Sequence, residues 1–244
     1  MRILVSNDDG IYSPGILALA QVAAKFGQVR VVAPDVEQSS MGQAITIQHP
    51  LRYHRTPIGD FEAYRVNGTP ADCVALGLHR WDKAELVLSG INIGSNLGHE
   101  VWYSGTVAAA RQAALAGVPA IAFSLVLEGA EPDFAVLAPY VEQVVRLLLD
   151  SPGPPLVNVN LPQRPTGLRW ARHSVRRHTY RLVEGRDPDG RPYYWVSDSP
   201  LADPAEDTDR WAVEHGFVAL TPLDLSVTDE DWLARRSDPG LALK

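Results

Sequence analysis

The chain has 244 residues, of which 45% are hydrophobic and 21% charged, a composition typical of a globular protein with one large domain, or one domain and an appendage. Its net charge of −7 argues against nucleic-acid binding, which depends on basic side chains that neutralise phosphates. The single cysteine, Cys73, excludes an internal disulfide and a cysteine-rich metal site, as expected in a reducing compartment.

No segment has the length and apolarity of a targeting or membrane segment. The first residues, MRILVS, are not followed by a long apolar region, so no signal peptide is evident. No stretch approaches the roughly 20 apolar residues that a membrane span requires. We therefore expect a cytoplasmic protein that has no membrane or nucleic-acid partner.

Apolar runs of strand length alternate with helix-length segments up to about residue 160. The predicted strands are residues 2–6, 29–33, 51–55, 61–66, 85–89, 119–124 and 156–161, with another extended stretch at 45–48. The predicted helices are residues 14–26, 69–78, 105–116 and 132–150, and a long glycine-rich loop is expected at 90–104. This alternation predicts an α/β fold with a mostly parallel, doubly wound sheet.

The composition changes beyond residue 165. Residues 171–200 are rich in arginine, histidine, aspartate and aromatic residues, and residues 187–190 (Asp-Pro-Asp-Gly) form a turn signal between runs of strand character. These runs predict a long hairpin that has too few apolar partners of its own to be stable alone. We therefore divide the chain into a core, residues 1–165, and a C-terminal arm and tail, residues 166–244, that pack on the core or on another subunit.

Two adjacent carboxylates, Asp8 and Asp9, follow the first strand directly. Ligands of open α/β sheets collect at the carboxyl ends of strands, so this pair lies where a site is expected. Two neighbouring negative charges repel unless a cation lies between them, and a divalent metal is the simplest such cation. A solvated turn is the alternative, since the flanking Asn7 and Gly10 also favour turns. These residues alone leave both readings open.

Further oxygen-rich loops follow two other predicted strands, at residues 38–42 and 90–96. Together with the carboxylates, their hydroxyl and amide groups suit magnesium, manganese or calcium better than zinc. Residues 103–106 (Tyr-Ser-Gly-Thr) open a helix, and the free N–H groups of a helix start can hold an anion. For Ser104, a plain N-cap is the alternative. A metal site beside a phosphate site points to phosphoryl-group hydrolysis.

Several sequence strings occur in order: MRILVSNDDG, VVAPD followed by Ser39, GTPADCV, SGINIGSNLG and YSGTVAAA. They resemble the survival protein SurE family over roughly residues 1–125. The resemblance implies a Rossmann-like core with an exchanged C-terminal arm, and hence a homodimer or homotetramer. It also implies a phosphatase that acts on nucleoside monophosphates and requires a divalent metal such as magnesium or manganese.

The resemblance also implies roles for individual residues. The implied metal ligands are Asp8, Asp9, Ser39 and Asn92, and the implied phosphate-binding residues are Asn96, Ser104, Gly105 and Thr106. The chain departs from the family pattern in one loop, where relatives often carry an arginine before the serine and then Gly-His-Ser. Here Gln38 and residues 42–44 (Gly-Gln-Ala) occupy those positions, which leaves the substrate preference open.

We therefore expect a metal-dependent phosphomonoesterase that hydrolyses nucleoside 5′-monophosphates, with 3′-monophosphates as further candidate substrates. Asp8 and Asp9 are the expected catalytic residues, because they would hold the metal and one of them could orient the attacking water. The alternative is a nucleotide sensor that uses the same pocket without catalysis. The chain has no P-loop sequence, so a P-loop NTPase is unsupported.

Overall fold

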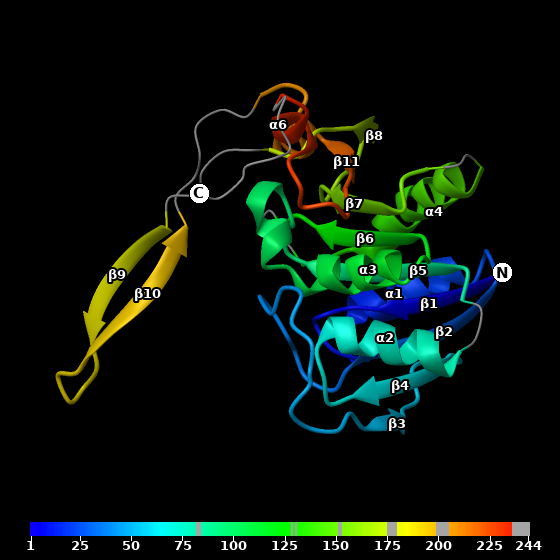
Figure 1. Cartoon of the computed structure of the whole chain (residues 1–244), viewed down its shortest axis with the longest axis horizontal. Coiled ribbons are helices and arrows are strands. Elements are labelled where there is room, and N and C mark those ends of the chain that lie inside the picture. The colour runs from blue at the N-terminus through cyan, green and yellow to red at the C-terminus, as the bar shows by residue number, and fades with distance from the viewer. Residues whose placement is uncertain are drawn as a thin grey trace, which may run out of the picture.

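A nine-stranded, mostly parallel sheet forms the centre of the molecule (Figure 1). The computed structural model describes residues 1–81, 84–127, 129, 131–150, 153–174, 180–198 and 205–235. Across the sheet the strands are β3 (Tyr53–Arg55), β4 (Glu62–Val66), β2 (Gln28–Pro34), β1 (Arg2–Ser6), β5 (Leu86–Ile93), β6 (Ala120–Leu125), β7 (Leu156–Leu161), β11 (Phe217–Pro222) and β8 (Gly167–Trp170). Strand β3 is antiparallel to β4, and β11 is antiparallel to β7, whereas the strands from β4 to β7 are parallel.

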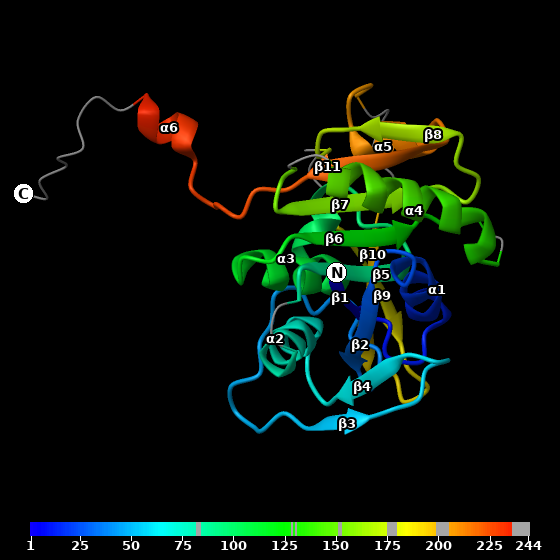
Figure 2. The ribbon, with the colours of Figure 1, turned by 90° about the vertical axis from the view of Figure 1, so that its right-hand side faces the viewer.

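Helices cover both faces of this sheet, as the doubly wound prediction requires (Figure 2). The helices α1 (Pro14–Ala23) and α4 (Phe134–Asp150) pack together on one face. The helices α2 (Pro70–Arg80) and α3 (Gly105–Leu115) pack together on the other. None of the helices in the described part of the chain is both long and apolar enough to cross a membrane.

Strand β1 shows why the central strands are continuously apolar. Ile3 and Val5 belong to the hydrophobic core beneath α1 and α4, whereas Leu4 belongs to the core beneath α2 and α3. Successive side chains of a strand point to opposite faces, so a strand covered on both faces needs apolar residues at every position. The short run at the start of the chain is therefore a buried central strand, as predicted.

The predicted extended stretch at residues 45–48 is wrong, because no strand forms there. The backbone N–H of Thr46 instead donates to Asp72 Oδ1, at 3.0 Å, and the hydroxyl of Thr69 donates to the carbonyl oxygen of Ala44, at 2.7 Å. Thr69 and Asp72 also form the capping box of α2. The loop is therefore held by the start of a helix rather than by a neighbouring strand.

The predicted loop at residues 90–104 is more regular than expected. Strand β5 continues to Ile93 after a shift in register against β6, which pairs Asn92 with Ser124. A short 3-10 helix, η1 (Gly98–Trp102), follows and leads directly into α3. The run of glycines concealed this extension, because glycine is normally depleted in strands.

Strands β8 and β11 were not predicted, and both extend the main sheet. Helix α5 (Asp209–Glu214) packs against β11. The pairing of β11 with β7 joins segments about 60 residues apart in the chain, and short segments of this kind carry no distinct local pattern. A last short helix, α6 (Glu230–Ala234), extends away from the sheet (Figure 2).

The predicted hairpin is present as β9 (Tyr180–Arg186) and β10 (Pro192–Asp198). It pairs antiparallel from Pro192 opposite Arg186 to Asp198 opposite Tyr180, and among the described residues these two strands pair only with each other. It projects from the side of the sheet on which the parallel strands end (Figure 1). The predicted ribbon spans residues 171–200, and its residues 175–179 and 199–200 lie outside the described ones.

Candidate active site

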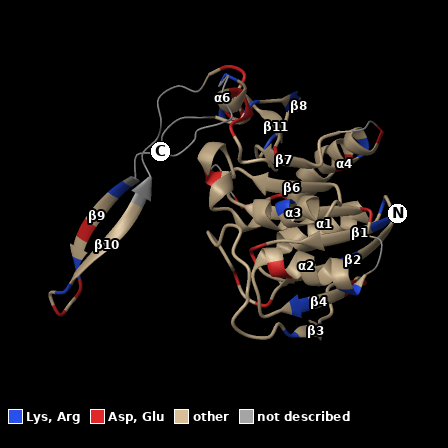
Figure 3. Ribbon diagram, in the orientation of Figure 1, with Lys and Arg blue, Asp and Glu red and all other residues tan. Residues whose placement is uncertain are grey.

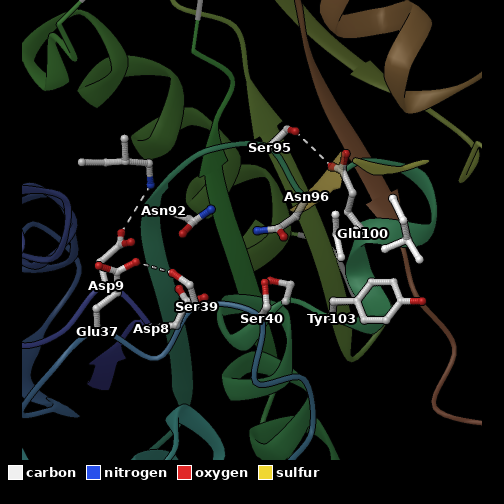
Figure 4. A pocket seen from close by; sticks show the side chains of 14 residues that line it. Asp8, Asp9, Glu37, Ser39, Ser40, Asn92, Ser95, Asn96, Glu100 and Tyr103 are labelled. Atoms are coloured by element: carbon white, nitrogen blue, oxygen red, sulfur yellow. Dashed lines mark hydrogen bonds between the residues drawn. The ribbon is translucent and has the colours of Figure 1, made fainter. Parts of the chain in front are cut away.

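A cavity of about 790 Å³ lies at the carboxyl ends of β1, β2 and β5 (Figure 4). The lining residues of this carboxylate cavity are Asp8, Asp9, Glu37, Ser39, Ser40, Asn92, Ile93, Ser95, Asn96, Glu100, Tyr103, Ser104, Leu182 and Val196. The first nine come from the end of β5 or from the loops that follow β1, β2 and β5, and these three parallel strands end at the same edge of the sheet.

Asp8 is the most deeply buried acid of the carboxylate cavity, with 4% of its surface exposed. The hydroxyl of Thr106 donates a hydrogen bond to Asp8 Oδ1. The first residue of α3, Gly105, approaches so closely that a Cβ there would lie 2.7 Å from the Cβ of Asp8. Glycine therefore allows the start of α3 to contact Asp8. Burial raises the pKa of the Asp8 carboxyl, although hydrogen bonds from Thr106 and the helix start oppose the rise.

Asp9 is held from a different element. Its Oδ2 accepts a hydrogen bond from the backbone N–H of Ile93, at 3.3 Å, so the end of β5 fixes its orientation. Burial raises the pKa of Asp9 to about 6, and the negative charges of Asp8 and Glu37 add to the rise. The turn after β1 brings both carboxylates to one cavity, which adjacent residues within a strand could not achieve.

Ser39 and Asn92 lie beside this carboxylate pair (Figure 4). The hydroxyl of Ser39 donates to Glu37 Oε1, at 2.6 Å. The amide nitrogen of Asn92 donates to the carbonyl oxygen of Gly94, at 2.8 Å, so the side-chain oxygen of Asn92 is the atom available to the cavity. The two hydrogen bonds therefore leave oxygen lone pairs, rather than N–H groups, beside Asp8 and Asp9.

The donor set fits a hard divalent cation. Carboxylate, hydroxyl and amide oxygens are the ligands that magnesium and manganese prefer. No lysine, arginine or histidine lines the carboxylate cavity among the described residues, so the raised pKa values of its two aspartates have no protein cation to offset them. No group of three or more histidine, cysteine, aspartate or glutamate side chains in the described ranges has metal-site geometry, so Ser39 and Asn92 are needed to complete a ligand set.

The residues implied to bind phosphate fall into two groups. Asn96 and Ser104 line the carboxylate cavity, whereas Gly105 and Thr106 lie behind it against Asp8. Ser104 is the N-cap of α3, and its hydroxyl accepts the backbone N–H of Val107, at 3.0 Å. The plain N-cap expected as the alternative for Ser104 is therefore present, and it does not prevent the hydroxyl from also donating to a ligand.

Asn96 belongs to a buried polar network at the back of the carboxylate cavity. Its side-chain nitrogen donates to the hydroxyl of Ser124, at 2.7 Å, and its backbone N–H donates to Asn160 Oδ1, at 2.8 Å. The side-chain amides of Asn158 and Asn160 in turn donate to the carbonyl oxygen of Asn96. This network fixes the loop between β5 and η1 from below.

Two more carboxylates, one from η1 and one from α5, hold this loop. Glu100 Oε2 accepts from the hydroxyl of Ser95 and from the backbone N–H of Leu97. Asp209, which is fully buried at the start of α5, accepts backbone N–H groups from Gly98, at 3.0 Å, and from Ser174, at 3.1 Å. The site loop and the segment that precedes the hairpin therefore share one buried anchor.

Sequence reasoning gave no role to two groups of residues in the carboxylate cavity. Glu37, Ser95 and Glu100 are polar residues in or near the loops singled out above, so their position after predicted strands was the available signal. Leu182 and Val196 come from the hairpin, and no local pattern in the sequence links them to the aspartates. The residue types of the hairpin indicated only that it needs a surface to pack on.

Comparison with known proteins identifies the family of the chain. A family model described as "Survival protein SurE" matches residues 3–180. The chain belongs to the survival protein SurE family. The matched range contains every residue singled out above as a metal ligand or a phosphate-binding residue, and it ends at the start of the hairpin.

Relatives in the SurE family are similar over nearly the whole chain. The "5'-nucleotidase SurE 1" of Thermus thermophilus is 48% identical over 239 residues, which cover 96% of this chain and 95% of that protein. The "5'-nucleotidase SurE" of Deinococcus radiodurans is 46% identical over 239 residues, covering 94% and 89%. The crystal structure of the SurE protein from Aquifex aeolicus is 37% identical, with a TM-score of 0.83 over 96% of this chain and 97% of that one.

Proposed function

We propose that this protein is a metal-dependent phosphomonoesterase that hydrolyses nucleoside 5′-monophosphates to a nucleoside and phosphate. The observation that carries the proposal is the pair of a buried Asp8 and a partly buried Asp9 in a cavity whose described lining residues include no lysine, arginine or histidine. Membership of the SurE family and relatives named 5′-nucleotidases at up to 48% identity support the same activity. No comparison favours a nucleotide sensor without catalysis.

Asp8, Asp9, Ser39 and Asn92 would hold the metal, for which we propose magnesium or manganese. When bound, such an ion supplies positive charge to a phosphate oxygen and lowers the pKa of a water molecule. Thr106 fixes Asp8 through its hydroxyl, and the backbone N–H of Ile93 fixes Asp9. The two carboxylates are thus oriented before any ligand arrives, which reduces the reorganisation needed during the reaction.

The phosphate would lie between the carboxylate pair and the start of α3. Asn96 and Ser104 line this part of the carboxylate cavity, and the N-terminal N–H groups of an 11-residue helix favour a negative charge there. For Gly105 and Thr106 we propose a role through Asp8 as well as through these N–H groups, since both lie against that carboxylate.

The nucleoside would occupy the other end of the carboxylate cavity, where Glu100, Tyr103, Leu182 and Val196 lie. An aromatic ring and two aliphatic side chains suit the flat, apolar surface of a base, whereas the carboxylate of Glu100 suits the ribose hydroxyls. The volume of about 790 Å³ is within the range of small-molecule sites.

Release of inorganic phosphate from AMP tests the proposed reaction. We expect no release by protein treated with EDTA and dialysed, and recovery when magnesium or manganese is added back. The 3′-monophosphate of adenosine, measured in parallel, determines the positional preference. Full activity without metal would contradict the metal-dependent mechanism, and AMP binding without phosphate release under any metal would favour the sensor.

Three substitutions distinguish the residues that bind the metal from those that bind the phosphate. Asn92→Ala should weaken metal binding first, because it removes a proposed ligand oxygen. Ser104→Ala should lower kcat/KM by about ten- to hundredfold, the effect of one charge-assisted hydrogen bond of roughly 1.5–3 kcal/mol, with metal affinity near normal. Thr106→Val distinguishes two roles: a loss of metal affinity indicates that Thr106 acts through Asp8, whereas a loss of phosphate affinity alone indicates direct contact.

We also propose that residues 166–244 serve assembly, and that the hairpin places this chain in a homodimer or homotetramer. The support is the exposed apolar surface of β10, where Tyr194 and Trp195 are 59% and 69% exposed. Exposed aromatic surface of this kind is typical of protein interfaces. Residues 1–165 would then carry the ligands of the metal and phosphate.

A further inference from the structure

A second cavity, of about 660 Å³, is lined in part by the η1 residues His99, Val101 and Trp102. We name it the arginine cavity, and its lining residues are Gln43, His99, Val101, Trp102, Arg111, Leu115, His173, Pro222, Leu223, Asp224, Leu225, Ser226 and Val227. None of them lines the carboxylate cavity. Neither the proposed reaction nor the family's metal and phosphate residues account for it.

Among the described residues that line the arginine cavity, Arg111 is the only lysine or arginine. It is also the only charged residue of α3, which Figure 3 shows otherwise uncharged. Among the described residues it has no hydrogen bond or ion pair, and its guanidinium carbon lies 5.6 Å from the centre of the Trp102 ring. Burial lowers the pKa of Arg111, as expected for a cation that lacks a nearby anion. A half-buried guanidinium in this state has its planar set of N–H donors free for a ligand.

Other polar groups of the arginine cavity also lack partners. His173 Nε2 and Gln43 Oε1 are buried without a hydrogen bond, although Gln43 donates its amide N–H to Gln112 Oε1, at 3.2 Å. The ring of His173 lies 6.1 Å from that of His99. Asp224 is the one carboxylate of this wall, and its Oδ1 accepts the backbone N–H of Ser226, at 2.9 Å. It forms no ion pair with Arg111.

Apolar side chains complete the arginine cavity. Trp102 and Leu115 are 56% and 57% exposed, and Leu223 and Leu225 also line the cavity. A ligand that pairs with the charge and covers the apolar surface of this cavity needs a negatively charged group for Arg111 and a flat apolar part for Trp102. A bare inorganic anion would leave the apolar surface uncovered, and a neutral ring would leave the guanidinium unpaired.

We propose that the arginine cavity is a second binding site, independent of the proposed reaction, for a small planar organic anion. Two sources share this chemistry: a nucleotide, which carries a base and a phosphate, and an aromatic carboxylate. Arg111 binds the anionic group, and the face of Trp102 covers the ring. His173 Nε2 and Gln43 Oε1 supply the remaining polar contacts.

Calorimetric titration of the full-length, metal-free protein tests this site, with AMP and salicylate as the two probes. Without metal the AMP stays intact. We expect saturable binding of at least one probe, weakened tenfold or more in Arg111→Gln, because a charge-assisted hydrogen bond is lost. Arg111→Lys, which keeps the charge but not the planar donors, should bind with intermediate affinity. The probe that binds identifies the source of the ligand.

Controls separate this outcome from the carboxylate cavity and from misfolding. Arg146→Gln, on the exposed side of α4, removes an arginine that pairs with Glu142 and should leave probe binding unchanged. If AMP also binds the carboxylate cavity, Ser104→Ala weakens that binding and leaves the Arg111-dependent site. Thermal melting of each variant verifies that it folds.

Three results would each overturn the proposal. The first is an absence of saturable binding for both probes, and the second is equal binding by wild type and Arg111→Gln. The third is a change of assembly mass in Arg111→Gln, measured by sedimentation, with probe affinity unchanged. That third result would indicate that a second copy of the chain covers the arginine cavity.

Discussion

Strand β1 and the β9–β10 hairpin are both short β-structures, but they are stabilised in opposite ways. Four of the five residues of β1 are buried, between helices on both faces of the sheet. In β10, Tyr193, Tyr194, Trp195 and Val196 are between 44% and 69% exposed. The first segment is positioned by its own chain, whereas a two-stranded hairpin is marginal without another surface.

The carboxylate cavity likewise has one part formed by the core and one part formed by the hairpin. The proposed metal ligands lie at the ends of strands of the buried sheet or in the loops that follow them, and hydrogen bonds from other core elements orient Asp8 and Asp9. Leu182 and Val196, which line the same cavity, come from the exposed hairpin. We infer that the chemistry of the site depends on the core and that its substrate-facing wall depends on how the hairpin is held. The predictions below test this division.

The largest effect should follow from Asp8→Asn. Loss of one carboxylate from the proposed ligand set should lower both metal affinity and kcat/KM by roughly a hundredfold or more, since even the loss of a hydrogen bond to a ligand typically costs ten- to hundredfold. The assembly mass should stay unchanged. Asp60→Asn, at an exposed turn, is the matched control. Equal metal affinity in the two variants would contradict the proposed ligand role.

Replacing the hairpin, residues 180–198, with a short Gly-Ser linker should change the assembly mass and leave the core folded. The core should still unfold cooperatively, because its strands and helices pack without the hairpin. Light scattering should show a smaller assembly than the intact protein, or aggregation through the newly exposed surface. An identical monomeric mass for both proteins would show that the hairpin does not mediate assembly.

A pair of alanine substitutions compares the two regions in stability. Leu88→Ala removes a fully buried side chain in β5 and should lower the free energy of unfolding by about 2–5 kcal/mol. Tyr194→Ala should change the stability of the isolated chain by less than about 0.5 kcal/mol, because this side chain is 59% exposed. Urea unfolding measures both. A large concentration-dependent effect of Tyr194→Ala would place that side chain in an interface.

The smallest effect concerns the pH dependence of the metal-free protein. The pKa of Asp9 is raised from 3.8 to about 6, so the folded state binds a proton that the unfolded chain has released between these values. The contribution of Asp9 to stability is therefore fully present below about pH 4 and is lost as the pH rises through about 6. Urea unfolding of wild type should show this loss, of about 1 kcal/mol at most since Asp9 is partly exposed.

Asp9→Asn is the control, because it lacks the titrating group. Its stability should vary less between about pH 4 and pH 7 than that of wild type. Metal binding to wild type should also weaken below about pH 6, since a proton then has to be displaced from Asp9. Identical pH profiles for the two proteins would show that Asp9 does not titrate in this range.

Much of the core was predictable because its signals are local. The apolar run at residues 2–6 and the acids that follow it identified both a strand and the edge where ligands collect. The hydrogen bond between Thr106 and Asp8 was not predictable, since it joins residues 98 positions apart and depends on the close approach of Gly105. Local patterns also gave no indication of β8 and β11, whose positions depend on pairing with distant strands.

The hairpin illustrates the other limit. Its turn and its alternating runs predicted the pairing of two strands, and that pairing is present. The local sequence of a hairpin does not specify its position when the surface that it packs on belongs to a distant part of the chain or to another subunit. The contributions of Leu182 and Val196 to the carboxylate cavity therefore became visible only in three dimensions.

Asp209 gives the molecule a mechanical connection between these two regions. One carboxylate oxygen holds Gly98 in the site loop, and the other holds Ser174 shortly before the hairpin. The two segments cannot shift independently without leaving a buried N–H or a buried charge unpaired. A displacement of Ser174 would thus be passed by the side chain of Asp209 to Gly98, two residues from Asn96 in the carboxylate cavity.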